Sequence, residues 1–319
     1  MADRVENFNV RKLRLEAAKL FRERATKFLF GDGESQKGDA SGDYIRLATI
    51  YPVGEMRPFV GPAVVHDLMG AKYDYPLVEH EHTVGVKRGV MERGDGISSQ
   101  EFTKAVAAIA NSPFARLEKD LTQLLVDNGT DITGASFFND NSTPGTKVIP
   151  GTTIEVTNDG SIAAGAAITA ASIRTAAWAA RTMLMTMRNS MNARYHEVDQ
   201  SYSIMYGPGI EEAVQNAFGF GVTINDQSDL KRLFVPKANP YLPNAAATVD
   251  QYIYVFLRGD PYGALGWGET KAPTFGATFG KSDAEGVIEE NRWKAQSYWD
   301  FGVGYGSPFS VVRIELDVT

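Results

Sequence analysis

His80 and His82 are the two residues whose type and spacing come closest to a metal-binding pair. They flank Glu81 in the polar segment 77–86, and a β-strand there would place both imidazoles on one face, because side chains alternate along a strand. Two imidazoles on one face can ligate a transition metal. The sequence offers no third ligand nearby. The pattern therefore favours an exposed strand of mixed charge, and we predict no metal site.

Two glycine-rich segments have the composition of nucleotide-binding loops but not the spacing. Residues 276–282 place three residues between the first two glycines, whereas a phosphate-binding loop needs four. Residues 302–306 lack the G-x-G-x-x-G spacing of a dinucleotide site and read better as a loop between strands. The motifs G-x-S-x-G and H-E-x-x-H do not occur. We therefore predict no catalytic residues, no cofactor-binding residues, no cofactor and no enzymatic activity.

The composition is that of an ordinary globular protein without cysteine chemistry. The 319 residues are 43% hydrophobic and 22% charged, which suits one large domain or two moderate ones. The chain has no cysteine, which excludes disulfides, zinc thiolate sites and cysteine nucleophiles. Its apolar runs, such as 252–257, are far shorter than the roughly 20 residues of a membrane span. The N-terminus lacks the apolar core of a signal peptide. We expect synthesis in a reducing cytoplasm.

The N-terminal segment differs in charge from the rest of the chain. Residues 1–30 hold eight Lys or Arg and four Asp or Glu, a net charge of +4, and the remainder carries −11. Helical periodicity predicts a helix over 9–30 with Asn9 as its N-cap, followed by a flexible linker over 31–43. We interpret the first 43 residues as an arm outside the core. A basic arm can dock on a neighbouring copy, on nucleic acid or on nothing. A membrane-surface helix is a further alternative, less favoured because such helices usually dock on protein.

The body of the chain predicts an α+β protein, with few helices and several strands that do not alternate regularly with them. The predicted helices span 98–128, 170–194 and 210–218, and the predicted strands span 44–51, 77–86, 201–206, 231–235, 250–257, 292–301 and 309–316. In the first of these helices, Ser98 and Glu101 form a capping box and Gly129 is the expected left-handed C-terminal residue. Pro113 either kinks this helix or splits it in two.

Several side chains have an expected place in the fold. The methionines at 183, 185, 187 and 191 recur at helical spacing and are expected to fill the core. Trp293 and Trp299 are expected to pack into the core from the same side of a strand. The strand 77–86 has a charged centre that cannot sit in the core of its own molecule without partners. We interpret it as a strand that needs contacts with copies of the protein.

The order of these segments resembles a known family. The residues that carry the resemblance are 83–88 with the glycine-rich turn to Gly96, Pro113 with Leu117, Leu121, Leu124, Leu125 and Gly129, then 137–140, 206–208 and 301–306. In this order and spacing the chain resembles the major capsid protein of tailed phages, which has the HK97-type fold. More narrowly it resembles the major head subunit of Mu-like phages.

The resemblance implies an α+β, HK97-type capsid fold with an N-terminal arm, an extended loop, a peripheral domain with a spine helix, and an axial domain. The implied limits are 1–45 for the N-terminal arm, 46–92 for the two-stranded extended loop, 93–165 for the peripheral domain with its spine helix, 166–285 for the axial domain and 286–319 for the return strands of the peripheral domain. Some members of the fold crosslink a loop lysine to an asparagine of a neighbour. Lys72 lies in the matching loop, but no partner is identifiable, so no such crosslink is predicted.

The resemblance also implies a structural function. The chain would self-assemble into hexameric and pentameric capsomers of an icosahedral shell, or virion head, that encloses double-stranded phage DNA. Portal, scaffold or decoration proteins would be further partners, DNA contact would be weak and non-specific, and no membrane would be involved. The virion would assemble from chains made in the bacterial cytoplasm. The alternatives are an encapsulin-like compartment that encloses a cargo enzyme, a soluble enzyme with an unrecognised site, and a tail-tube protein.

Leu121 and Leu125 provide a test of the predicted spine helix. Each is expected to bury apolar area worth roughly 2 kcal/mol or more. Replacing both with Asp should therefore abolish folding, because two carboxylates would enter the core. Circular dichroism and solubility measure the outcome. A soluble, folded double variant would contradict the assignment of this helix face to the core.

Overall fold

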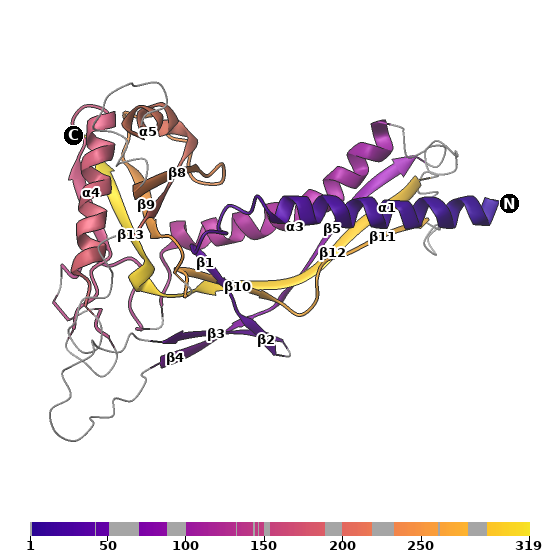
Figure 1. Ribbon diagram of the computed structural model, residues 1–319, viewed down its shortest axis with the longest axis horizontal. Helices are drawn as coiled ribbons and strands as arrows, with labels where there is room; N and C mark the ends of the chain where they lie inside the picture. Colours follow the sequence, from indigo (N-terminus) through magenta and orange to yellow (C-terminus); the bar gives the residue numbers. More distant parts are fainter. Residues whose placement is uncertain are drawn as a thin grey trace, which may run out of the picture.

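The protein is an elongated molecule with two sheets at opposite ends and two long helices lying along one of them (Figure 1). The computed structural model describes residues 2–41, 43–50, 70–87, 100–131, 133–142, 144–145, 147–149, 154–188, 200–218, 233–260, 262–279 and 292–319. Among the helices of these residues, none combines the length and the apolar character needed to cross a bilayer.

The first sheet is organised around one long strand, β12. Its strands are β1 (Ser35–Lys37), β5 (Val78–Lys87), β10 (Leu265–Glu269), β11 (Thr274–Phe279) and β12 (Arg292–Tyr305). β5 pairs antiparallel with β12 along 292–301, while β11 and β10 pair in succession with its other edge. β1 adds a parallel strand to β10. The 14 residues of β12 thus pair directly with three of the other four strands of this sheet.

Two helices cover one face of this sheet. They are α1 (Ala2–Ala25) and α3 (Gln100–Asp127), which lie side by side over β12 and its neighbours in Figure 1. Leu117, Leu121 and Leu125 of α3 have no exposed surface, as the apolar spacing predicted. The ring of Phe21 from α1 stacks on Phe114 of α3 with centroids 4.7 Å apart, and Trp299 of β12 lies edge-on beneath Phe21. The core here is largely aromatic.

The second sheet lies at the other end of the molecule under two helices. Its strands, in spatial order, are β6 (Asp159–Ala163), β13 (Val311–Asp317), β9 (Gln251–Leu257), β7 (Tyr202–Tyr206) and β8 (Phe234–Ala238). The helices are α4 (Ala170–Thr186) and α5 (Glu211–Phe218), with short 3₁₀ turns η1 (Pro208–Ile210) and η2 (Pro308–Ser310) beside the strands. Thr169 caps α4, because its hydroxyl accepts from Ser172 N–H at 3.3 Å while the Ser172 hydroxyl accepts from Thr169 N–H at 2.8 Å.

A third, small sheet forms a hairpin that projects below the first sheet (Figure 1). It consists of β2 (Asp39–Ser41), β3 (Tyr44–Ile50) and β4 (Gly70–Pro76), all antiparallel. Arg46 of β3 donates two hydrogen bonds to the carboxylate of Asp74 in β4, at 2.9 and 3.0 Å. We name β3 and β4 together the β3–β4 hairpin.

Four glycines give the β3–β4 hairpin its seat on the first sheet. Gly266 and Gly268 of β10 lie directly opposite Gly304 and Gly302 of β12. On β10, a Cβ atom added to Gly266 would lie 2.0 Å from Leu47, and one added to Gly268 would lie 2.6 Å from Ile45. On β12, a Cβ atom added to Gly302 would lie 2.4 Å from the Pro76 carbonyl oxygen, and one added to Gly304 would lie 2.1 Å from the Tyr75 ring. These contacts leave no room for any side chain. We name these four residues the glycine floor.

The glycine floor corrects the prediction for residues 302–306. The segment was expected to be a loop, whereas Gly302 and Gly304 lie inside β12. The hairpin supplies the reason, since its side chains occupy the space above both glycines. Tyr75 adds a polar tie, because its hydroxyl donates to the Tyr305 carbonyl and accepts from the Tyr305 N–H, both at 3.0 Å.

The polar strand also differs from the prediction. β5 needs no second copy for its backbone, because ten of its residues pair with β12 of the same chain. Side chains alternate between the two faces of β5, which explains how its charged centre is accommodated. Glu79 and Glu81 are exposed, whereas His80 and Val84 are only partly exposed and lie toward α3. The second strand of the hairpin is therefore β4 rather than this segment, and the strands β10 and β11 were not predicted.

The N-terminal segment is part of the core, which corrects its interpretation as an arm. Leu13, Ala17 and Phe30 have no exposed surface. The helix begins at Ala2, so Asn9 is an interior residue rather than its cap, and the expected linker 31–43 contains the strands β1 and β2. The apolar stripe of α1 packs against α3 and β11, and a sequence pattern cannot show this tertiary contact.

The ends of the two longest predicted helices have mixed outcomes. Pro113 lies inside α3, which continues through it, while the capping box at Ser98 lies outside the described residues. The left-handed residue after α3 is Asn128, with φ of 48°, rather than Gly129. Asn128 takes this role because its side chain clamps the Phe138 backbone, accepting from N–H at 2.6 Å and donating to C=O at 3.1 Å. α4 ends at Thr186, eight residues before the predicted limit.

The expected core side chains are partly placed by the structure. Met187 and Trp299 are buried, and Met183 and Met185 are partly exposed. Met191 and the side chain of Trp293 lie outside the described part of the chain.

The glycine floor predicts an unusual sensitivity to a single methyl group. Gly304→Ala should lower the free energy of unfolding by about 1–3 kcal/mol, because its Cβ overlaps the Tyr75 ring. The matched control is Gly276→Ala in β11, where no atom lies within 4 Å of the added Cβ. That change should be neutral or slightly stabilising, since glycine weakens a strand. Denaturant titration of both variants measures the difference, and equal effects would refute the glycine floor.

Candidate functional site: a charged junction and two exposed surfaces

The predicted histidine pair lies in a small cavity between β5 and α3. His80 and His82 line a space of about 240 Å³ together with Ser112, Arg116 and Ser297. The His80 ring stacks on Phe301 with centroids 4.2 Å apart. Burial, helped by the positive charge of Arg116, lowers the pKa of His80. A neutral imidazole stacked on hydrocarbon beside a guanidinium is an unfavourable place for a cation.

The remaining sequence candidates are dispersed. Over the residues that the structure describes, no cluster of three or more His, Asp or Glu could hold a metal ion. The other two histidines of the sequence, His66 and His196, lie outside these residues. Gly276 to Phe279 of the glycine-rich segment form part of β11, paired with β12, and the rest of that segment lies outside the described range.

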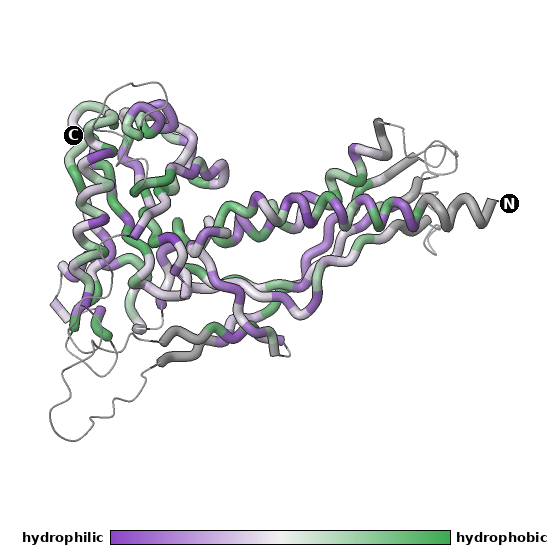
Figure 2. The backbone as a smooth tube through the Cα atoms, viewed as in Figure 1, coloured by the Kyte–Doolittle hydropathy of each residue, from purple (hydrophilic) through white to green (hydrophobic). Residues whose placement is uncertain are grey.

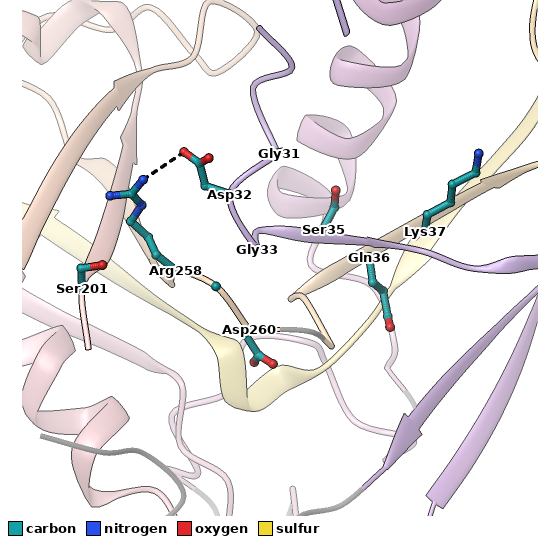
Figure 3. A pocket seen from close by; sticks show the side chains of 10 residues that line it. Gly31, Asp32, Gly33, Ser35, Gln36, Lys37, Ser201, Arg258 and Asp260 are labelled. Carbon is teal, nitrogen blue, oxygen red and sulfur yellow. Dashed lines mark hydrogen bonds and ion pairs between the residues drawn. The ribbon is translucent and has the colours of Figure 1, made fainter. Parts of the chain in front are cut away.

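A polar cleft lies at the junction between the N-terminal segment and the second sheet (Figure 3). It has a volume of about 770 Å³ and is lined by residues 31–33 and 35–37, Ser201 and 258–260. Asp32 accepts from Lys237 Nζ at 2.9 Å and from Arg258 at 3.4 Å. Its pKa is lowered, chiefly by the hydrogen bond from Lys237.

A buried carboxylate extends this junction into the core. Glu34 has no exposed surface and pairs with Lys237 Nζ at 2.6 Å. It also accepts from the Ser203 hydroxyl of β7 and from the backbone N–H of Asp32 at 2.7 Å. A buried carboxylate is tolerated only with such partners. The segment before β1 is thereby held to β7 and β8 of the second sheet.

The junction cleft holds charges in place rather than offering them for a reaction. The Asp260 carboxylate accepts from the Ser310 hydroxyl and from Tyr262 N–H at 2.9 Å, and the Asp32 carboxylate is held ionised by two cations. General acid–base catalysis needs a group whose pKa lies near the working pH. The lowered pKa of Asp32 does not meet that requirement, and the Asp260 carboxylate is already engaged by two donors. The geometry therefore supports a structural tie between the two sheets.

The outer face of α1 is the first exposed surface of interest. It presents the exposed cations Arg11, Arg14, Lys19 and Arg22 and the exposed acids Glu16 and Glu23, and the exposed Lys27 follows just after the helix ends. Figure 2 shows hydrophilic and hydrophobic stretches alternating along this helix. We name these five cations the α1 basic face. An excess of positive charge on a chain of net charge −7 favours an anionic partner.

The α1 basic face is rigidly mounted. Arg24 Nη2 pairs with Glu118 of α3 at 2.5 Å, and Glu118 is only 3% exposed. The Leu29 N–H donates to the same carboxylate at 3.0 Å. Burial raises the pKa of Glu118, and both of these hydrogen bonds oppose the rise. These contacts fix where α1 ends and hold it against α3.

The β3–β4 hairpin is the second exposed surface. It projects from the glycine floor away from both helices (Figure 1). Tyr44 at its base is 52% exposed, and Val78, which follows the hairpin at the start of β5, is 51% exposed. Large apolar side chains exposed on a projecting element are typical of a surface that contacts other molecules.

Comparison with solved structures identifies the fold. The chain matches the capsid protein of cyanophage P-SCSP1u with a TM-score of 0.51 and 11% identity, covering 91% of this chain and 88% of that one. It matches the capsid protein of a native GTA particle with a TM-score of 0.51 and 12% identity, covering 91% and 90%. The predicted α+β, HK97-type capsid fold is thus confirmed. No protein-family model matches the chain, and no curated protein sequence does.

The buried junction predicts which ion pair matters for stability. Lys237→Met should cost about 3–5 kcal/mol, because it leaves the carboxylate of Glu34 buried without a counter-charge. Lys37→Met is the matched control, since Lys37 is 53% exposed in its pair with Glu269 and should cost less than about 1 kcal/mol. Thermal and denaturant unfolding compare the two. Similar small losses would show that Glu34 does not depend on Lys237.

Proposed function

We propose that this chain is the major capsid, or head, subunit of a tailed phage, and that it self-assembles into an icosahedral shell around double-stranded DNA. The single observation that carries the proposal is the fold, which follows two capsid chains over about nine tenths of its length. The exposed hairpin and the α1 basic face support it, because a shell subunit needs several surfaces that contact other molecules. The role would be structural rather than enzymatic, in keeping with the engaged carboxylates of the junction cleft.

The domain names of this fold can be proposed for the observed sheets. The first sheet with α1 and α3 would be the peripheral domain, with α3 as its spine helix. The β3–β4 hairpin would be the extended loop, and the second sheet with α4 and α5 would be the axial domain. Compared with the limits proposed from sequence, β6 and β13 would move to the axial domain. β5, β10 and β11 would move to the peripheral domain, because each strand would be assigned together with the strands that it pairs with.

The proposal also specifies partners and location. Copies of the chain would be the principal partners, in hexameric and pentameric capsomers, with the hairpin lying over a neighbouring subunit. The α1 basic face would meet DNA by weak, non-sequence-specific contacts, since cations that neutralise phosphates release counterions. Portal, scaffold and decoration proteins would be further partners. The product would be a virion head, assembled from chains made in the host cytoplasm.

The narrower resemblance to Mu-like head subunits remains a proposal. It is supported by the order of the segments that carry it, several of which have structural roles. Phe137 and Phe138 are buried beside the end of α3, and Gly302 and Gly304 belong to the glycine floor.

Electron microscopy of the purified full chain tests the proposed function. We expect closed particles, or capsomers that elute far above monomer size and close into particles on further assembly. The variants Gly304→Ala and Gly276→Ala add a matched pair under conditions where both are folded. The first disturbs the seat of the hairpin and should impair particle formation, whereas the second should assemble normally.

Each outcome of this experiment bears on the proposal. A stable monomer or small oligomer under all assembly conditions would refute it. Particles that form equally well from both variants would remove the hairpin from the assembly mechanism. Particles that enclose a protein cargo and no nucleic acid would favour the encapsulin-like alternative.

A further inference from the structure

Three fully buried polar side chains lie close together in the region that follows α3. Asp131, Lys147 and Asn158 each have no exposed surface. The Lys147 Nζ atom lies 2.8 Å from the Asp131 carboxylate and 3.4 Å from the Asn158 side-chain oxygen. A lysine is almost never fully buried without a specific reason. We name these three residues the buried triad.

Local backbone contacts bring the buried triad together. Val156 N–H donates to the Lys147 carbonyl and Ile149 N–H to the Ile154 carbonyl, both at 2.9 Å, so Lys147 and Asn158 approach from two facing segments. Asp131 is fixed by its own turn, where its carboxylate accepts from Thr133 N–H at 2.7 Å. The triad is therefore preorganised by hydrogen bonds on each of its members.

Aromatic rings close the site against water. Phe137 is fully buried and Phe138 is 2% exposed. Lys147 Nζ lies 5.4 Å from the Phe137 ring centroid and donates to the Phe137 carbonyl. Burial lowers the pKa of Lys147, and the nearby charge of Asp131 partly opposes this. In such surroundings, transfer of one proton from the ammonium to the carboxylate removes two buried charges and leaves a nucleophilic amine.

The amide of Asn158 is held as an electrophile. Its oxygen accepts from Asn139 N–H at 3.1 Å, and its NH₂ group donates to the carbonyls of Phe137 at 2.9 Å and Pro308 at 3.2 Å. The Asn139 N–H points at the atom on which negative charge develops when an amine adds to the carbonyl carbon. A backbone donor so placed stabilises the tetrahedral intermediate.

We propose that Lys147 and Asn158 form an intramolecular amide bond, with Asp131 as the catalytic proton carrier. The Lys147 amine, having given one proton to Asp131, adds to Cγ of Asn158. Asp131 passes its proton to the Asn158 side-chain nitrogen and takes one from the Lys147 nitrogen, which is now bonded to Cγ. The Cγ–Nδ2 bond breaks, ammonia leaves, and no oxidant or cofactor is consumed. Lys147 Nζ already lies 3.4 Å from the Asn158 side-chain oxygen, which is bonded to the carbon that it would attack. Reactants held close together in this way gain a large effective concentration for such a step.

The bond would tie the buried loops within one subunit. It closes a covalent ring between residues 147 and 158, next to the turn η2 at Pro308. This site is distinct from the surfaces proposed for assembly, since all three members are inaccessible. The inference therefore does not depend on the proposed function.

Intact-mass spectrometry of the full chain, denatured after purification, tests the proposal. We expect a mass lower than the sequence mass by one ammonia, and fragment spectra in which a peptide containing Lys147 is joined to one containing Asn158. Lys147→Met and Asn158→Ala should restore the full sequence mass of each variant. Asp131→Asn should abolish or strongly slow the reaction. Lys37→Met, an exposed lysine elsewhere, should keep the loss of ammonia.

Three results would overturn the proposal. The full sequence mass for the folded wild-type chain would mean that the triad is only a buried ion pair with its hydrogen bonds. Loss of water together with a Lys147–Asp131 link would show that the electrophile is Asp131 rather than Asn158. Loss of ammonia that persists in Lys147→Met would place the reaction at another pair of residues. The wild-type mass alone decides whether ammonia is lost, so the test holds even where a variant fails to fold.

Discussion

The seating of the β3–β4 hairpin on the glycine floor is the contact on which the rest of the architecture depends. Side chains alternate along β12, so Gly302 and Gly304 face the hairpin while Trp299, Phe301 and Tyr305 face the core beneath α3. One strand thus carries a smooth face for the hairpin and an aromatic face for the helices. Because the hairpin touches backbone on this floor, its direction is set by the sheet. A projecting element with a fixed direction is what an assembling subunit requires.

The two sheets are connected by ion pairs as well as by the continuous backbone. β12 continues through η2 into β13, and the segment before β1 is bound to the second sheet through Glu34, Lys237 and Asp32. Breaking such a buried pair costs far more than breaking an exposed one. The N-terminal segment therefore does two jobs in the fold: α1 completes the core over the first sheet, and the residues after it fasten the second sheet to the first.

These features agree with a subunit that acts by contact. The carboxylates of the junction cleft are committed to cations, a hydroxyl and a backbone donor. His80 stacks on Phe301, whereas His82 is exposed. Among the described residues, the exposed surfaces include the rigid α1 basic face and the β3–β4 hairpin with Tyr44 at its base. Shell proteins need many moderate interfaces rather than one tight one, because only the surplus over the entropic cost of association appears as affinity. An elongated shape with separated contact surfaces suits that requirement.

The sequence by itself determined the α+β class, the main helices and most strands, because apolar periodicity and turn residues act locally. The helical spacing of Leu117, Leu121 and Leu125, for example, predicts the buried face of α3. Only the tertiary structure decided where β5 pairs, why Gly302 and Gly304 lie in a strand, and that α1 belongs to the core. It alone brought Asp131, Lys147 and Asn158 together. The physical reason is that strand pairing, close backbone approach and burial of a charge depend on residues far apart in the chain, and no local pattern records which segments will meet.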